Sequence, residues 1–305
     1  MMSPSLSKAL DFIRANQNSD GGWGYRPRCQ SFTEPTGFCA LALFSGGDKT
    51  AAGRALDFLK ACQKDNGAIS LDPKDTEGNW MAYAALLAFH ALGAASEERR
   101  LKDWILSFKD ASDRFTPADI KAIAATLHYD ASIPGWPWTP NTTAWVEPTA
   151  LFLIALIRAG TPLTQDRIRS GISLILDRKV RSGGWNFGNP ASMSHKLEAS
   201  LMSTAIALAA LAAAGYPENR PPVEDGLRFL GRCLAGEVST ASLGWCLLVL
   251  KSFSSEASRV QGIAARLAGL QAADGSFRRN LFETALAFLV LVDPGALLRI
   301  PGRNG

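Results

Sequence analysis

The chain alternates between two kinds of apolar pattern, and this alternation recurs along its length. In the first kind, apolar residues fall at positions i, i+3 and i+4 with polar residues between them, as in segments 9–14 and 172–176. This spacing predicts an amphipathic helix with one buried stripe. In the second kind, as in segment 148–160, apolar residues occupy nearly every position. A helix without a polar face must be surrounded by protein, so the first kind predicts outer helices and the second kind inner helices.

A short turn motif separates the two helices of a pair and sets the period of the repeat. Its first copy is Gln17-x-x-x-Gly21-x-Trp23. The other copies begin at Gln63, Lys179 and Gln271, and Pro134-Gly135-Trp136 is a degenerate copy. The first two copies are 46 positions apart, and the copies at Lys179 and Gln271 are twice as far apart. A fixed period of this size predicts stacked supersecondary units.

Six helical hairpins follow from these patterns. They are expected at residues 5–17 with 34–46, 50–63 with 79–93, 117–128 with 143–160, 165–178 with 197–215, 222–235 with 239–253, and 256–271 with 281–292. Segment 97–108 is expected to be an extra helix between the second and third pairs. Hairpins with wet outer and dry inner helices can close into a ring that leaves no end to cap. We therefore predict an all-α fold, an (α/α)6 double-layered toroid of six helical hairpins, with residues 1–305 in a single domain.

Composition and charge are those of an ordinary globular protein. The chain has 47% hydrophobic and 20% charged residues, as expected for a protein with a large core. The formal net charge of +4 is small for 305 residues, and Lys and Arg are scattered, so no nucleic-acid partner is expected. The five cysteines show no Cys-x-x-Cys spacing, which predicts buried free thiols in a reducing compartment.

The sequence contains no recognisable export or membrane-spanning segment. The N-terminal stretch MMSPSLSKAL has no apolar core of a secretory signal. The longest apolar run, 201–215, is shorter than the roughly 20 residues that span a bilayer. We therefore expect a cytoplasmic protein, while peripheral membrane contact and the oligomeric state stay open.

The repeated Gln-x-x-x-Gly-x-Trp turn resembles the signature of squalene–hopene cyclases and oxidosqualene cyclases, which are class II terpene cyclases. It resembles the turns of protein prenyltransferase β-subunit toroids more loosely, and it is most similar to those of short bacterial prenyltransferase/squalene-oxidase repeat proteins. The resemblance runs along essentially the whole chain and includes the Glu-Pro-Thr starts of two inner helices, at Glu34 and Glu147. It implies a toroid fold, an isoprenoid ligand, and a structural turn whose Gln ties the end of the outer helix to the next helix.

The catalytic motifs of those families are missing from this chain. Class II terpene cyclases protonate their substrate with an Asp-x-Asp-Asp motif, and the nearest approach here is Asp110-Ala-Ser-Asp113. The Asp-x-Cys zinc ligands of protein prenyltransferases and the Asp-Asp-x-x-Asp cluster of class I cyclases are also absent. The three histidines have no ligand-like spacing with a cysteine. We therefore expect no metal and no cofactor. The chain is also about half as long as a full triterpene cyclase.

Aromatic residues gather just before the predicted inner helices. Their ring faces stabilise a carbocation through the ring quadrupole, as they do any cation. The candidate substrate-binding residues are Tyr25, Trp80, Trp136, Trp138, Trp145, Trp185, Phe187 and His195. The alternative is that these rings pack the turns, and it is favoured for Trp23 and Trp185, which lie inside the turn motif. His195 lies three residues before Glu198, so the two could form an acid–base pair or half of a metal site. The alternative, which is favoured, is that His195 is a lone surface histidine.

Carboxylates gather at the same ends of the inner helices. The candidate catalytic residues are Glu34, Glu147, Glu198 and Glu283. A carboxylic acid in a dry aromatic cavity has a raised pKa and can act as a general acid. The alternative is that these side chains favour the positive end of the helix macrodipole. It explains Glu283 better than it explains the repeated Glu-Pro-Thr triplet.

These features favour a terpene-cyclase-like protein that binds a linear isoprenoid in a central apolar cavity and starts a cyclisation or isomerisation by protonation. The first alternative is a non-catalytic toroid that holds a lipid or serves as a scaffold, because the known acid motif is missing. The second is a toroid glycosidase, in which paired carboxylates and sugar-stacking tryptophans give a similar pattern.

Overall fold

The computed structural model describes residues 4–192, 195–253 and 256–298, and these divide into two compact units. Unit 1 comprises residues 1–106 and 239–305, and unit 2 comprises residues 107–238. The helices of unit 1 are α1 (Pro4–Ala15), α2 (Thr33–Ser45), α3 (Lys49–Cys62), α4 (Ala82–Leu92), α5 (Ala95–Ser107, its last residue in unit 2), α11 (Thr240–Ser252), α12 (Ala257–Ala268), α13 (Leu281–Val292) and the 3₁₀ turn η2 (Pro294–Ala296). Unit 2 contains η1 (Ser112–Arg114), α6 (Pro117–Leu127), α7 (Val146–Arg158), α8 (Asp166–Asp177), α9 (Leu201–Ala213), α10 (Pro221–Cys233) and a small hairpin of β1 (Ala191–Ser192) and β2 (His195–Lys196).

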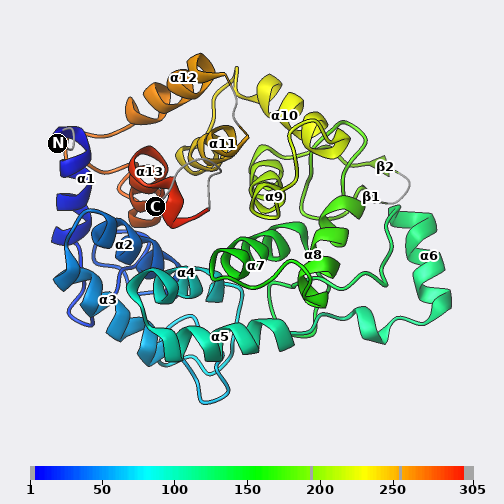
Figure 1. The fold of residues 1–305 in the computed structure, drawn as a ribbon, viewed down its shortest axis with the longest axis horizontal. Coiled ribbons are helices and arrows are strands. Elements are labelled where there is room, and N and C mark those ends of the chain that lie inside the picture. The colour runs from blue at the N-terminus through cyan, green and yellow to red at the C-terminus, as the bar shows by residue number, and fades with distance from the viewer. Residues whose placement is uncertain (1–3, 193–194, 254–255, 299–305) are drawn as a thin grey trace. The chain divides into compact units, whose positions relative to one another are not determined.

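The helices that are apolar on all sides form the centre of each unit, as the hydrophobic pattern predicts. In unit 1, α2 packs between α4 and α13, and α13 also packs against α11 (Figure 1). Every residue of α2 from Thr33 to Leu43 is buried. In unit 2, α7 packs against α9. Amphipathic helices cover these centres, and α8 does so through a stripe of four buried residues.

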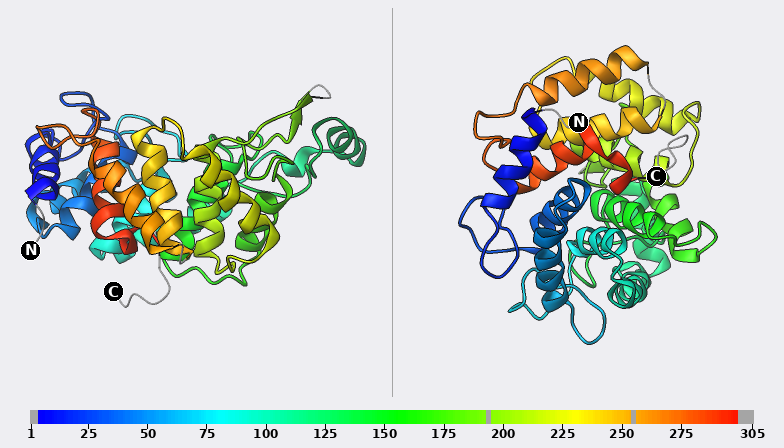
Figure 2. Two further views of the ribbon diagram at one scale, coloured as in Figure 1. Left: turned by 90° about the horizontal axis from the view of Figure 1, so that it is seen from above. Right: turned by 60° about the vertical axis from the view of Figure 1, so that its left-hand side comes forward.

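The Gln-x-x-x-Gly turn connects successive outer helices, which confirms the structural role that the family resemblance implies. The amide of Gln17 donates to the carbonyls of Gly21 (2.8 Å) and Ala51 (2.9 Å), the latter in α3. The amide of Gln271 repeats these bonds to Gly275 and to Ser5 in α1, both at 2.8 Å. The turn at Gln271 therefore joins the C-terminal part of unit 1 to α1, and α1 also packs on α13 (Figure 2).

The glycines of the first two turns are required by both their backbone and their surroundings. Gly21 and Gly67 both adopt φ +87°, a region that side chains with a Cβ rarely enter. A Cβ on Gly21 would lie 2.4 Å from the carbonyl oxygen of Arg54, and one on Gly67 would lie 2.4 Å from that of Arg100. The outer helices therefore approach the turn backbone as closely as glycine permits.

A threonine near the start of four inner helices, α2, α7, α9 and α13, holds the aromatic residue of the turn. The backbone N–H of Trp23 donates to the hydroxyl of Thr36 (2.9 Å). The equivalent bonds join Trp136 to Thr149 (2.9 Å), Trp185 to Thr204 (2.9 Å) and Phe277 to Thr284 (3.0 Å). These hydrogen bonds explain why threonine recurs at one aligned position of the repeat.

The third outer helix differs from the one expected from the sequence. The amide of Gln63 donates to the carbonyl of Glu97 (3.0 Å) in α5, just as Gln17 binds α3. The helix at 97–108 therefore has the contacts of a regular outer helix. In contrast, α6 buries none of its residues, so pairing 117–128 with 143–160 as a packed hairpin was wrong. The repeat period gave the wrong outer helix here because the turn between α6 and α7 is degenerate and does not mark the register.

No helix in the described ranges is both long and apolar enough to cross a membrane.

Candidate functional site

Glu34 lies in the first turn of α2 in unit 1, and the repeat fixes its position. The preceding residue, Thr33, donates its N–H to the carbonyl of Leu71 (2.9 Å) and its hydroxyl to the carbonyl of Ser70 (2.7 Å). These bonds hold the start of α2 against the loop that follows α3. Pro35 fits the first helical turn because the N–H that it lacks has no partner there. The side chain of Glu34 is consequently directed into the unit, and the residue is 6% exposed.

Two tyrosines bind the two oxygens of the Glu34 carboxyl group. Tyr25, from the loop before α2, donates its hydroxyl to Oε2 at 2.5 Å. Tyr83, in α4, donates its hydroxyl to Oε1 at 2.6 Å. The carboxyl group is therefore held by one donor from its own repeat and one from the next repeat.

The pKa of Glu34 is raised by burial, and the hydrogen bonds from Tyr25 and Tyr83 offset part of this increase because they favour the carboxylate. The pKa values of Tyr25 and Tyr83 are raised as well, first by burial and then by the neighbouring Glu34. Both phenols therefore keep their protons and remain donors. A carboxyl group in this setting can give up a proton, and the resulting carboxylate already has two donors in place.

Aromatic rings surround the Glu34–Tyr25–Tyr83 cluster. The ring of Trp80 is stacked on that of Tyr83, with centroids 6.0 Å apart and an interplanar angle of 14°. Phe38 packs edge-on against Tyr83 at 6.0 Å and against Phe282 at 4.8 Å. Phe282 also packs against Tyr25 at 6.4 Å. The faces of such rings attract a cation more strongly where water is excluded.

Glu283 is a second acidic residue in unit 1, in the first turn of α13 and adjacent to Phe282. Its backbone N–H is capped by the side chain of Asn280 (3.0 Å). Its Oε2 atom is buried and has no hydrogen-bond partner among the described residues. A buried oxygen without a partner is costly and calls for a functional or solvent explanation. The capping interpretation therefore accounts for the backbone of Glu283 but not for its carboxyl group.

Glu147 occupies in unit 2 the position that Glu34 occupies in unit 1. It lies in the first turn of α7 and accepts a hydrogen bond from the hydroxyl of Ser203 in α9 (2.7 Å). Burial raises the pKa of Glu147, and the bond from Ser203 lowers it in part. Its surroundings are more open than those of Glu34, and it has one hydroxyl donor where Glu34 has two.

Glu198 and His195 are both exposed, so the structure does not bury them as an acid–base pair. His195 is in β2, where it pairs with Ser192 of β1. Because the segment is extended and not helical, the spacing of three residues does not place these side chains one helical turn apart. Glu198 lies on the edge of a surface pocket, described below.

The remaining aromatic candidates fall into two groups. Trp136 and Trp185 are completely buried inside their turns, as the packing alternative predicts for Trp185. The guanidinium of Arg167 covers Trp136, 4.5 Å from the ring centroid. Trp138 and Trp145 are half-buried, and Phe187 is 58% exposed. Their role in substrate binding stays a prediction.

Tyr83, Phe38 and Phe282 were missed by the sequence analysis. Tyr83 follows the predicted Trp80 by three residues, about one helical turn, so its place beside Trp80 could have been predicted. Its bond to Glu34, 49 positions away, could not. Phe38 and Phe282 lie on inner helices, where an apolar residue carries no signal of its own. The described residues contain no group of three or more His, Cys, Asp or Glu side chains that could hold a metal ion.

The fold and the turn contacts are those of an α/α toroid. The family model of the prenyltransferase alpha-alpha toroid domain matches residues 1–51 and 47–126. Drimenyl diphosphate synthase from Streptantibioticus cattleyicolor is 37% identical over 67 residues. That match covers 22% of this chain and 13% of the synthase, so it spans a small part of the relative's length.

Among solved structures, the type II terpene cyclase MstE from Scytonema is similar with a TM-score of 0.65 and 17% identity. The match covers 96% of this chain and 98% of that protein. An α-amylase from Clostridium perfringens is similar with a TM-score of 0.62 and 13% identity, over 94% of this chain and 97% of that protein. These likenesses confirm the predicted α/α toroid fold and the resemblance to terpene cyclases. At such identities they establish the fold and leave the reaction open.

Replacing Tyr83 by phenylalanine is expected to raise the pKa of Glu34 further, because the lost hydrogen bond favours the carboxylate. A raised pKa in the folded state stabilises the protein at low pH. That contribution is lost as pH rises from the ordinary carboxyl range through the folded-state value. The free energy of unfolding should therefore decline with rising pH over a wider range in Tyr83→Phe than in the wild type. Urea unfolding at a series of pH values measures this.

The matched control for Tyr83→Phe is the pair Glu34→Gln and Glu34→Gln/Tyr83→Phe, which cannot titrate at position 34. These two variants should show the same pH dependence as each other. If Tyr83→Phe and the wild type give superimposable pH curves, the hydrogen bond from Tyr83 does not tune Glu34.

Proposed function

We propose that the protein is a terpene-cyclase-like enzyme that binds a linear isoprenoid in an apolar cavity and isomerises or cyclises it with Glu34 as the proton donor. The observation that carries this proposal is the buried Glu34 carboxyl group, held by Tyr25 and Tyr83 within a group of aromatic rings. A general acid needs a protonated form, and burial favours that form by raising the pKa of Glu34. A carbocation needs electron-rich faces, and Trp80, Phe38 and Phe282 supply them.

The proposed chemistry conserves the atoms of the substrate. The Glu34 proton is transferred to one carbon of an alkene, so that a C–H bond forms from the π electrons while the O–H bond of Glu34 breaks. The tertiary carbocation left on the neighbouring carbon is either attacked by a second alkene, which forms a ring, or shifts its position. An adjacent carbon then loses a proton to water, its C–H electrons form the new alkene, and solvent returns a proton to the Glu34 carboxylate. The product is therefore an isomer of the substrate.

The relatives support an isoprenoid as the ligand class. A variant of MstE from Scytonema has been solved in complex with its substrate, geranylgeranyl dihydroxybenzoate. The matched synthase from Streptantibioticus cattleyicolor is named for a drimenyl diphosphate product. We propose further that residues 1–305 act as one domain, because the match to MstE extends across both units. The free cysteines support a place in the reducing cytoplasm.

A non-catalytic lipid-binding toroid is the second candidate function. The absence of an Asp-x-Asp-Asp motif favours it. A glycosidase shares the fold, as the α-amylase from Clostridium perfringens shows. However, the Glu34 carboxyl group is bound by two tyrosines among phenylalanines, whereas glycosidases use two carboxyls across a bound sugar.

The test of the proposed function begins with mass spectrometry of lipids that copurify with the protein. The purified protein is then incubated with squalene and with farnesyl and geranylgeranyl diphosphates, and the products are analysed by gas chromatography after phosphatase treatment. We expect a product of unchanged mass and altered retention time. Binding of an isoprenoid without turnover would favour the lipid-binding toroid, and the absence of both binding and turnover would refute both candidates.

A further inference from the structure

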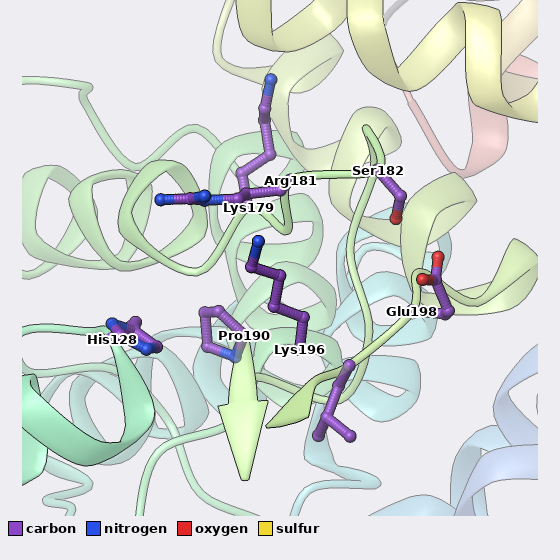
Figure 3. A pocket seen from close by; sticks show the side chains of 8 residues that line it. His128, Lys179, Arg181, Ser182, Pro190, Lys196 and Glu198 are labelled. Carbon is purple, nitrogen blue, oxygen red and sulfur yellow. The ribbon is translucent and has the colours of Figure 1, made fainter. Parts of the chain in front are cut away.

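Unit 2 contains a surface pocket that the proposed isoprenoid chemistry does not use. Its volume is about 360 Å³, within the size range of small-molecule sites. It is lined by His128, Lys179, Arg181, Ser182, Pro190, Lys196, Leu197 and Glu198. These residues come from the end of α6, the turn after α8, and the β1–β2 hairpin with the segments on either side of it (Figure 3).

The charges of this pocket are mostly positive, and two of them are uncompensated. Arg181 and Lys196 are exposed, and neither forms an ion pair within the described ranges. Lys179 is bound to Asp225 of α10 and is therefore neutralised. Glu198 is the one carboxylate of the lining, and it lies with Ser182 away from His128 (Figure 3). The pocket therefore has two cations available to a ligand from two separate elements.

His128 contributes a third nitrogen-bearing group through an unusual backbone conformation. It ends α6 with φ 60° in the left-handed region, which a residue with a Cβ seldom adopts. Its backbone N–H donates to the carbonyl of Ala124 (3.1 Å), which fixes the end of the helix at the pocket edge. His128 lines the same pocket as Arg181 and Lys196 (Figure 3).

We propose that this pocket binds a phosphate-bearing anion with more than one negative charge, of the diphosphate class. A guanidinium provides a planar fork for two phosphate oxygens, and an ammonium provides a compact point charge. Because Arg181 and Lys196 lie on separate elements, they can bind different oxygens of one ligand. A ligand with several charged oxygens therefore suits the pocket better than a ligand with a single carboxylate. The same chemistry is offered by a soluble diphosphate and by the phosphate headgroup of a lipid.

The first test measures the affinity of inorganic pyrophosphate by isothermal titration calorimetry at low ionic strength. The double variant Arg181→Gln/Lys196→Gln should bind about tenfold more weakly or worse, because two charge-assisted contacts are lost. Glu198→Gln should bind more tightly than the wild type, because it removes the carboxylate that repels the anion. Added salt should weaken wild-type binding more than binding by the double variant.

The matched control removes the same charge elsewhere on unit 2. Lys121 in α6 and Arg169 in α8 are exposed and do not line the pocket. The variant Lys121→Gln/Arg169→Gln should keep wild-type affinity, and circular dichroism should show all variants folded. The proposal is overturned if the wild type does not bind pyrophosphate, if both double variants lose affinity equally, or if Arg181→Gln/Lys196→Gln binds like the wild type.

A second arm identifies the source of the phosphate. Flotation with phosphatidylcholine vesicles that contain phosphatidic acid tests a lipid headgroup. Vesicle binding that is lost in Arg181→Gln/Lys196→Gln and displaced by pyrophosphate assigns the pocket to the headgroup. Pyrophosphate binding without vesicle binding assigns it to a soluble ligand.

Discussion

Replacing Glu34 by glutamine is expected to reduce the conversion of an isoprenoid by about 10²–10⁴-fold, the usual contribution of a positioned general acid. Glutamine has nearly the same volume and keeps a carbonyl oxygen for one of the two tyrosines, but it has no acidic proton. Substrate affinity should change little, because the surrounding rings of Phe38, Phe282 and Trp80 are untouched. Initial rates of product formation and equilibrium binding of the substrate measure the two effects separately.

The other acidic residues provide the rival outcomes for this experiment. If Glu147→Gln or Glu283→Gln abolishes turnover while Glu34→Gln retains it, the proton donor has been misassigned. Glu283 is the stronger rival because its buried Oε2 has no partner among the described residues. Loss of substrate binding in Glu34→Gln would instead indicate that Glu34 helps to bind the isoprenoid and does not donate the proton.

The fold could be predicted from the sequence because its determinants are local and repeated. Three features recur: the Gln–Gly–aromatic turn, the aligned threonines and the helices that are apolar on all sides. The structure of one copy can therefore be predicted from another. The prediction was wrong for segment 117–128, where no Gln-x-x-x-Gly turn marks the register. The helix at 97–108 was predicted to be an extra helix outside the repeat. However, α5 begins as far after the turn at Gln63 as α3 begins after the turn at Gln17. Gln63 binds the backbone carbonyl of Glu97, and a backbone carbonyl is present whatever the residue type, so the sequence does not reveal this bond.

The candidate site could be predicted only in part. Glu34 and Tyr25 were identified because an acid and an aromatic residue stand out before an apolar helix. Tyr83 was not identified, because its partner is 49 positions away in the chain. The contact of Arg167 with the ring of Trp136 could not be predicted either, because Arg167 belongs to another element, α8. The spacing of residues along the sequence reveals the repeat. Contacts between side chains of different repeats depend on how the helices pack, which the spacing does not show.

Replacing Trp23 by alanine is expected to lower the free energy of unfolding by about 3–5 kcal/mol, the usual cost of removing a large buried ring. Trp23 is completely buried, and its indole N–H donates to the carbonyl of Ile13 at 2.8 Å. Trp185 makes the same bond to Ile175 at 2.5 Å in unit 2. The ring therefore fills the space between the outer helix and the turn and also caps a backbone carbonyl. Urea unfolding followed by circular dichroism measures the loss.

Trp23→Phe separates the packing of the ring from its hydrogen bond. Phenylalanine already occupies this position of the repeat at Phe277, so the turn can hold its ring. The substitution should cost about 1–3 kcal/mol, because the carbonyl of Ile13 loses its donor and a smaller ring leaves part of the space empty. The matched comparison is Trp138→Ala, which removes a half-buried ring outside the turn motif and should cost less than Trp23→Ala. Equal losses for Trp23→Ala and Trp138→Ala would mean that the turn aromatic does not support the hairpin, and the structural role assigned to the repeat would then be wrong.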